Sequence, residues 1–408
     1  MSWTIAQCRS GALCSGDLVL ALVSTVRDEI SVAGWRSDCV CRRARQPIFV
    51  AELKRKAGMM VRTRFESIGA YTPTTVRSTE DLTAALAVPK SWDLERITGI
   101  RNRRVYDSHP DRYESSFDLA LRAIADCLHH SGYTVDELDV IISASITRTR
   151  GKEIFCYAPS FAVMLGRATG ADAARCFDVS NACAGMFTAV MVLDRMIKAG
   201  VVRNGLVVSG EQITPIAETA VREISQPYDP QFASLTVGDA ACAVVLDGRG
   251  DDDDEIHYVE LMTAADGAEH CGGMPSDITG GMAMYTDNRA MQNEARYQQG
   301  IDRLSDFLTE TGRGWESEKY DYWIHHQFSA PAIDYISDLT ERHFGTPMPQ
   351  KLNVLRDYGN TASTSHFLVL HEHLAQQKIP KGSKILMIPA ASGIVSGYLA
   401  ATISRLEA

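Results

Sequence analysis

DVSNACAGMFTAVMVLDRMIKAG, at residues 178–200, combines a turn of small residues with an apolar helical run, and the strand-like sequence LVVSGE follows it. A second stretch, DYGNTASTSHFLVLHEHLAQQKIPKG at residues 357–382, has the same order of features and leads into ILMIPAASG. Asn181 and Asn360 mark matching positions in the two stretches, 179 residues apart. A repeat of this length predicts two similar halves around one core, with a functional site where the two turns meet.

The rest of the chain supports an α/β fold. From Met60 onward, strand-like and helix-like runs alternate, which is typical of buried sheets covered by helices. A helical run at residues 117–130 leads into the strand VIISASIT, and a run at 301–311 leads into YWIHHQFSA. We therefore expect a first half at residues 60–246 and a second half at residues 255–408.

Composition excludes several classes of protein. The chain has 408 residues, of which 45% are apolar, and its formal net charge of -10 argues against binding to nucleic acid or anionic lipid. No apolar run approaches the ~20 residues that a membrane-spanning helix needs. The ten cysteines form neither a disulfide framework nor a zinc-binding pattern, so no metal site is expected. These features predict a cytoplasmic protein.

Residues 1–58 differ from the acidic remainder of the chain. They contain four of the ten cysteines and carry nine Lys or Arg against five Asp or Glu. The only apolar run in this segment is short and lacks a signal-peptide cleavage site. We interpret it as an extension outside the fold, with a natural start near Met59 or Met60; a regulatory or metal-binding arm is the alternative.

Cys183 is the candidate nucleophile. It lies where the strand-like CFDVS turns into the apolar helix, and its neighbours Ala182, Ala184 and Gly185 allow a sharp turn and a close approach of substrate. The positive end of the helix dipole predicts a lowered pKa for a thiol at this position. The alternative is a small buried cysteine that only packs in the core.

The sequence resembles the β-ketoacyl-ACP synthase III family over nearly everything after Met60. The cysteine turn DVSNACAGM and six further segments occur in that family's order: IGAYTP, SWDLERITGIRNRRV, TVGDAACAVVLD, IHHQ, DYGNTAS and SGIVSGYLA. The resemblance implies a five-layered αβαβα thiolase fold, a homodimer, and a catalytic site of Cys183, His326 and Asn360. It also implies acyl-CoA or acyl carrier protein thioesters as substrates, with no separate cofactor.

The chemistry assigns roles to these residues. His325 and His326 are neighbours on a strand and should face opposite sides; the HQ match selects His326, which leaves His325 as a packed or surface histidine. His326 Nε2 and Asn360 Nδ2 would stabilise an enolate. The backbone N–H groups of Cys183 and Ser392 would form a separate oxyanion hole for the acylation of Cys183.

Other positions carry weaker expectations. Trp92 and Arg96 occupy the places that hold the nucleotide part of coenzyme A in the family, although alone they would be an ordinary core aromatic and a solvated charge. Pro331 replaces an arginine expected to dock the carrier protein. GDAACA replaces GDGAGA, and residues 212–237 form a longer segment, as in the branch that condenses two long acyl chains or makes specialised metabolites. That branch uses a glutamate of the partner subunit as base, for which Glu153 is the candidate; a surface carboxylate is the alternative.

The expected activity is transfer of an acyl group to Cys183, followed by decarboxylative Claisen condensation with a malonyl thioester to give a β-ketoacyl thioester. A non-decarboxylative, head-to-head condensation of two acyl-CoA molecules is one alternative. Another is an acyltransferase that passes the acyl group to an alcohol or amine. A catalytically silent partner subunit that shapes an acyl tunnel would not need the thiol, imidazole and amide together.

Overall fold

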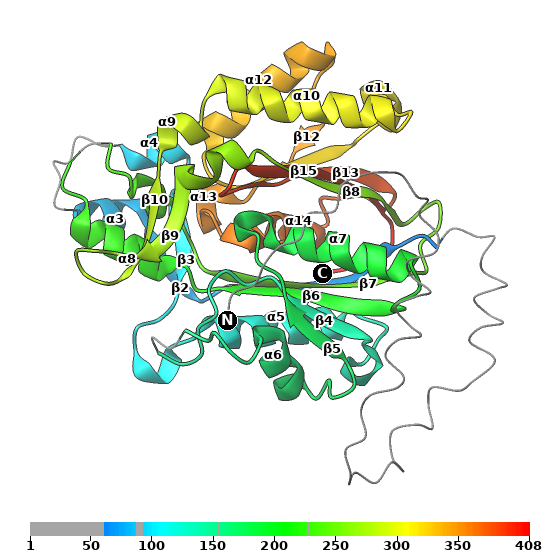
Figure 1. Cartoon of the computed structure of the whole chain (residues 1–408), viewed down its shortest axis with the longest axis horizontal. Helices are drawn as coiled ribbons and strands as arrows, with labels where there is room; N and C mark the ends of the chain where they lie inside the picture. The colour runs from blue at the N-terminus through cyan, green and yellow to red at the C-terminus, as the bar shows by residue number, and fades with distance from the viewer. Residues whose placement is uncertain (1–60, 87–92, 153–154, 227) are drawn as a thin grey trace, which may run out of the picture. The chain divides into compact units, whose positions relative to one another are not determined.

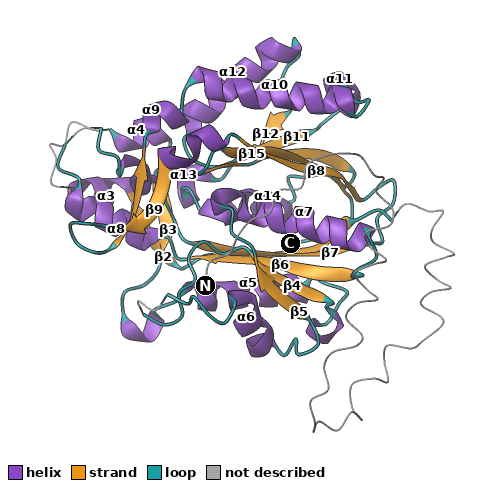
Figure 2. Ribbon diagram, in the orientation of Figure 1, coloured by secondary structure: helices purple, strands orange, loops and turns teal. Residues whose placement is uncertain are grey.

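The computed structural model describes residues 61–86, 93–152, 155–226 and 228–408 (Figure 1). The predicted extension at residues 1–58, Trp92 and Glu153 lie outside the described residues. Two sheets, each covered by helices on both faces, make up the described part of residues 59–408 (Figure 2).

The first sheet contains five strands in the order β1-β7-β6-β4-β5. The strand β7 is antiparallel to its neighbours β1 and β6, whereas β4 runs parallel to both β6 and β5. Every residue of β6 and β7 is buried, because helices cover both faces of the sheet. The bounds are β1 Arg64–Tyr71, β4 Val140–Ser143, β5 Arg175–Asp178, β6 Asn204–Glu211 and β7 Ala240–Asp247.

The second sheet has six strands. Its order is β12-β11-β13-β15-β14, and β8 pairs with the other edge of the long strand β15. The strand β11 is parallel to β12 and β13, and β15 is antiparallel to β13, β14 and β8. The bounds are β8 Glu255–Thr263, β11 Tyr322–His325, β12 Gln350–Lys351, β13 Ser383–Ile388, β14 Ala390–Ala391 and β15 Val395–Ile403.

The helices complete five layers. Figure 1 shows α7 (Gly185–Lys198) and α14 (Ser365–Ala375) between the two sheets, α5 (Ser116–His129) and α6 (Phe161–Thr169) outside the first sheet, and α10 (Glu294–Glu310) and α12 (Ala330–Phe344) outside the second. This αβαβα arrangement confirms the predicted fold class. None of the described helices is long and apolar enough to cross a membrane.

Shorter elements complete the described part of the chain. The strands β9 and β10 form an antiparallel hairpin, and β2 pairs with β3. The bounds are β2 Thr75–Ser78, α3 Thr79–Ala84, α4 Leu94–Thr98, β3 Asn102–Val105, α8 Thr214–Glu223, β9 Cys271–Pro275, β10 Met282–Thr286, α9 Asn288–Met291, α11 Trp315–Glu318 and α13 Leu355–Tyr358.

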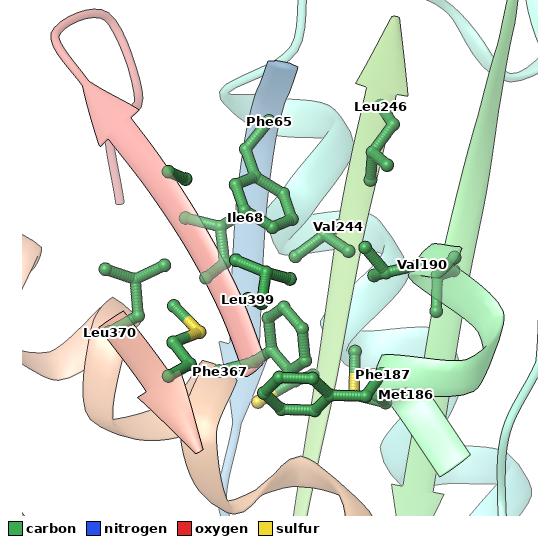
Figure 3. Close-up of a cluster of buried hydrophobic side chains, with 14 of the residues drawn as sticks. Phe65, Ile68, Met186, Phe187, Val190, Val244, Leu246, Phe367, Leu370 and Leu399 are labelled. Atoms are coloured by element: carbon green, nitrogen blue, oxygen red, sulfur yellow. The ribbon is translucent and has the colours of Figure 1, made fainter. Parts of the chain in front are cut away.

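The central helices hold the sheets together. Phe367 of α14 makes an edge contact with Phe65 of β1 and a tilted ring contact with Phe187 of α7, with ring centroids 6.1 and 5.8 Å apart (Figure 3). Four consecutive residues of α14, from Phe367 to Leu370, are fully buried. A helix that is apolar on all sides is typical of a layer enclosed between two sheets.

The two halves repeat with a spacing that differs by one residue from the sequence prediction. A 3-10 turn begins at Ala182 and another at Ala362, 180 residues later, and α7 and α14 follow the two turns with the same spacing. Both alanines have a left-handed backbone, with φ of 45° and 56°. The predicted pairing of Asn181 with Asn360 is therefore wrong, because the turn geometry makes Ser363 the counterpart of Cys183.

Candidate active site

The structure brings four of the predicted site residues to one cavity. Cys183, His326, Asn360 and Ser392 all line a cavity of about 440 Å³, whose walls are mostly apolar. They come from four separate segments: the 3-10 turn before α7, the end of β11, the turn before α14, and the turn between β14 and β15. The repeat thus places the two equivalent turns, one carrying Cys183 and the other following Asn360, at a common site.

Close packing fixes the turn that carries Cys183. Gly185 begins α7 against the end of β4, where an added Cβ would lie only 2.8 Å from the carbonyl oxygen of Ala144. Ala182, with its left-handed backbone, lies immediately before Cys183. Non-glycine residues in this conformation store about 1 to 3 kcal/mol and are concentrated at functional sites.

Burial decides the protonation state of Cys183. Removal from water raises the pKa of the Cys183 thiol to about 12, and the neighbouring Cys271 and Glu211 raise it further. The sequence-based prediction of a lowered pKa is therefore wrong for the free protein, because desolvation of the thiolate outweighs the helix dipole. The resting side chain is therefore a thiol, and a nucleophilic role would require it to lose this proton.

His326 is a neutral imidazole in the cavity wall. Its backbone N–H donates to the carbonyl oxygen of Ile388 at 3.0 Å, which extends the pairing of β11 with β13. Burial, followed by the proximity of His366 and His325, holds the pKa of His326 well below its usual value. His326 is only 4% exposed, and its Nδ1 has no hydrogen-bond partner among the described residues.

His325 also lines the cavity, although the sequence predicted that only one of the two histidines would face the site. Its Nδ1 lies 3.1 Å from the carbonyl oxygen of His326, and its ring packs against Trp323 and Phe328. Burial lowers its pKa to about 4. His325 is thus the packed histidine that the sequence predicted, although it lines the same cavity as His326.

A third histidine was not singled out from the sequence. His366, in the first turn of α14, is fully buried, and its ring stacks on that of His326 with centroids 5.6 Å apart. Its Nε2 lies 2.9 Å from the carbonyl oxygen of Ile388, and burial lowers its pKa to about 3. The only sequence signal was its place in a helix predicted to be buried. This stacking contact restrains the orientation of the His326 ring.

Hydrogen bonds fix both backbone polar groups of Asn360. Its backbone N–H donates to the carbonyl oxygen of Thr236, and its own carbonyl accepts from the N–H of Gly238, both at 2.9 Å. The side-chain Oδ1 accepts a hydrogen bond from the backbone N–H of Ala362 at 3.0 Å. Since this bond occupies the oxygen end of the amide, the nitrogen end remains as a donor at the cavity.

Ser392 is linked to a second thiol. Its Oγ donates to the Sγ of Cys271 at 3.0 Å, and Thr286 donates to the same sulfur at 3.4 Å. Cys271 begins β9 and lines the cavity together with Cys183. The sequence offered no sign of this pairing, because β9 lies almost 90 residues after the cysteine turn. Assignment of acylation to Cys183 must therefore exclude Cys271 by experiment.

A buried carboxylate supports the second turn. Glu211, at the end of β6, accepts hydrogen bonds from the backbone N–H groups of Ile146 and Thr147 and from the hydroxyl of Ser363. Burial raises the pKa of Glu211. This carboxylate connects the first sheet to the residue that corresponds to Cys183 in the second half. It was missed because its partners are distant in sequence.

The predicted coenzyme-binding residue Arg96 does not line the cavity. It is exposed on α4, where its backbone N–H is capped by Asp93. The end of α4 packs closely on the start of α12, since a Cβ at Gly99 would lie 2.5 Å from the Cβ of Ala330. Pro331 occupies the first turn of α12, where a missing N–H is tolerated. The role of Arg96 remains a prediction.

Comparison with known proteins shows a similarity to one family in both halves of the chain. The family described as 3-oxoacyl-[acyl-carrier-protein (ACP)] synthase III matches residues 177–267, and its C-terminal domain matches residues 311–403. The β-ketoacyl-[acyl-carrier-protein] synthase III of Deinococcus deserti is 28% identical over 334 residues, which are 80% of this chain and 87% of the relative. These matches support a synthase III-like member of the thiolase superfamily. The chain is accordingly an enzyme of the acyltransferase type.

Other members agree with this assignment. The synthase III of Clostridium novyi is 25% identical over 354 residues, covering 83% of this chain and 98% of its own. Among solved structures, OleA of Xanthomonas campestris with bound lauric acid and lauroyl-CoA matches with a TM-score of 0.71 at 20% identity, over 84% of this synthase III-like chain and 100% of that one. The synthase III of Aquifex aeolicus gives 0.68 at 23% identity, over 83% and 99%. These matches confirm the predicted thiolase fold.

Proposed function

We propose that this protein condenses two acyl thioesters, with Cys183 as nucleophile and His326 and Asn360 as enolate-binding donors. The observation that carries the proposal is that these three side chains, from three distant segments, line one mostly apolar cavity. An apolar cavity with a few converging polar groups is the usual form of a site for a small ligand. The chemistry uses the thioesters and the side chains alone, without a separate cofactor.

In the first step, the sulfur of Cys183 attacks the carbonyl carbon of an acyl thioester. The carbonyl oxygen becomes an oxyanion, and the backbone N–H groups of Cys183 and Ser392 are the proposed donors. The carbon–sulfur bond to the carrier then breaks, and the thiol proton of Cys183 ends on the departing thiol. The products are an acyl group on Cys183 and a free carrier thiol.

In the second step, a malonyl thioester loses carbon dioxide. The electron pair of the broken carbon–carbon bond moves into an enolate, whose oxygen accepts hydrogen bonds from His326 Nε2 and Asn360 Nδ2. Two neutral donors fit this role, and the lowered pKa of His326 keeps its ring uncharged at neutral pH. The enolate carbon attacks the acyl group on Cys183, and the cysteine thiolate leaves from a β-ketoacyl thioester.

A second candidate is the non-decarboxylative, head-to-head condensation of two acyl-CoA molecules. The fold match to OleA, whose structure contains lauroyl-CoA, and the mostly apolar cavity favour it. Here a carboxylate must remove a proton from the donor, since no decarboxylation generates the carbanion. Glu153 of the partner subunit is the proposed base.

A homodimer is part of the proposal, and the edge strand β5 supports it. Within the described residues, β5 pairs with β4 along one edge and has no strand on its other edge. A strand that presents unpaired N–H and C=O groups is a template for pairing with another chain. Pairing of β5 with its copy would place two first sheets side by side.

Radiolabelled substrates distinguish the two reactions. With an acyl-CoA and malonyl-CoA labelled in the free carboxyl group, the first candidate predicts release of labelled carbon dioxide in equal amount to the β-ketoacyl product. With acyl-CoA alone, the second candidate predicts a condensed product that disappears in Glu153→Ala. Product from acyl-CoA alone, together with no labelled carbon dioxide, would overturn the decarboxylative reaction. Absence of product in both assays would overturn condensation itself.

A further inference from the structure

The helix α10 presents a continuous stripe to the cavity. Successive turns contribute Arg296 and Tyr297, then Gly300 and Ile301, then Arg303 and Leu304, and all six line the cavity. Residues three and four apart lie on one face of a helix, so these pairs form one wall. Gly300 is at the middle of this wall, within a helix of 17 residues.

Nothing in the local structure requires glycine at this position. Gly300 has an ordinary helical backbone, and a Cβ added there would meet no atom within 4 Å. By contrast, a Cβ at Gly185 or Gly99 would collide with a neighbouring element. Glycine is the least favourable helix residue apart from proline, so its presence in mid-helix needs another reason.

The cavity-lining residues around Gly300 fall into a polar set and an apolar set. Gln292, Arg296, Gln299 and Arg303 form a polar rim, in which Gln292 and Arg303 are exposed. Ile301, Leu304, Ile336 and Tyr398 form a buried floor, each no more than 6% exposed. Gly300 lines the same cavity beside both sets, and a side chain there would enter open space.

The floor is suited to an alkyl chain. The hydroxyl of Tyr398 donates to the carbonyl oxygen of Gly300 at 3.0 Å. Thr340 also lines the cavity, and its hydroxyl donates to the carbonyl oxygen of Ile336 at 2.8 Å. The polar groups of the floor are therefore already paired within the protein. The pantetheine arm of a carrier has two amide groups, which would lose their hydrogen bonds to water on this surface.

We infer that Gly300 is a specificity-determining residue, which admits a long, unbranched aliphatic acyl chain to the floor of the cavity under α10. The inference rests on the proposed acylation of Cys183 and names the substrate class of that site. The side chain at position 300 then sets the upper limit of chain length. Short acyl groups, which do not extend past α10, are insensitive to it.

Acylation across a series of chain lengths tests the inference. Wild type, Gly300→Ala and Gly300→Leu are incubated with butyryl-, octanoyl- and palmitoyl-CoA, and the acyl mass on Cys183 is followed over time. For Gly300→Leu we expect an unchanged rate with butyryl-CoA and a loss with palmitoyl-CoA on the order of tenfold or more, since several methylenes lose their apolar contacts. Gly300→Ala should lie between the two.

A control on the same helix separates a blocked cavity from a disturbed helix. Ala295 is exposed on α10 and does not line the cavity. Ala295→Leu should therefore match wild type at every chain length, and both leucine variants should show wild-type circular dichroism. Equal rates for Gly300→Leu and wild type with palmitoyl-CoA would overturn the inference.

Two further outcomes have distinct meanings. An equal loss at all chain lengths in Gly300→Leu would assign this part of the cavity to the carrier's pantetheine arm and overturn the inference, while leaving acylation of Cys183 established. Failure of the wild type to be acylated by any member of the series would contradict the proposed function. The two failures are therefore distinguishable in one experiment.

Discussion

At the scale of single residues, the sequence located the candidate reactive groups but not their protonation states. The motifs pointed to Cys183 and His326, and both line the same cavity. The pKa of Cys183 depends on burial and on Cys271 and Glu211, which come from β9 and β6. No local pattern shows which distant side chains surround a residue, so the helix turn alone predicted a shift in the wrong direction.

The pH dependence of alkylation tests the raised pKa of Cys183. Because the thiolate reacts and the pKa of Cys183 is raised to about 12, the thiolate fraction should grow about tenfold for each pH unit across the neutral range. Iodoacetamide labelling of the Cys183 peptide, measured by mass spectrometry from pH 7 to pH 9.5, should therefore rise without a plateau. A free small thiol in the same reaction should level off near its own pKa of about 8.5. A plateau for Cys183 at or below that pH would support the helix-dipole prediction instead.

The donor role of Asn360 predicts a separation of the two steps. Asn360→Ala should slow malonyl decarboxylation by about a hundredfold or more, the effect of removing one oxyanion donor, while Cys183 is still acylated. Asn360→Asp is the matched variant, because it keeps an oxygen that can accept from the N–H of Ala362 but loses the amide donor. Normal decarboxylation in Asn360→Asp would show that the amide nitrogen is not needed.

At the scale of elements, the repeat was recognised from sequence, but its spacing was not. Matching side chains suggested 179 residues, whereas the two 3-10 turns and the helices after them repeat after 180. The left-handed alanines at positions 182 and 362 mark the true correspondence. Alanine gives no sequence signal for this conformation, which glycine usually adopts. The stripe of α10 that faces the cavity was likewise hidden, since it includes two arginines and a glycine.

Two glycine substitutions should have opposite effects on stability. Gly185→Ala places a Cβ 2.8 Å from the carbonyl oxygen of Ala144, so we expect a loss of about 1 to 3 kcal/mol in the free energy of unfolding. Gly300→Ala adds a methyl group to open space in a helix, so we expect a gain of about 0.5 to 1 kcal/mol. Denaturant unfolding measures both. Equal effects of the two substitutions would contradict the packing described for α7.

At the scale of the whole molecule, the resemblance and the repeat together predicted the five layers, and the structure confirms them. The cavity could not be predicted in the same way, because its walls combine β9, β10, α10, α12 and β15 with the turns that precede α7 and α14. Residues of α10 and of the second sheet that meet across the cavity have no recognisable spacing in the sequence. The motifs therefore predict the chemistry, whereas the cavity is visible only in the folded chain.

The proposed homodimer makes a prediction about β5. If β5 pairs with its copy, its amides should be protected from hydrogen exchange as strongly as those of β4, and sedimentation should give twice the mass of one chain. Dilution to monomer should release the protection of β5 while that of β4 persists, because β4 lies between β5 and β6. Rapid exchange of β5 in a sample that sediments as a dimer would assign the interface to another surface.

The most direct test of the account is the site of acylation. After incubation with a panel of acyl-CoA thioesters, peptide mass spectrometry should find the acyl group on the peptide that contains Cys183. The modification should be lost in Cys183→Ala and retained in Cys271→Ser, the matched change at the second thiol of the cavity. An acyl group on Cys271, or one that persists in Cys183→Ala, would contradict Cys183 as the nucleophile and with it the proposed reaction.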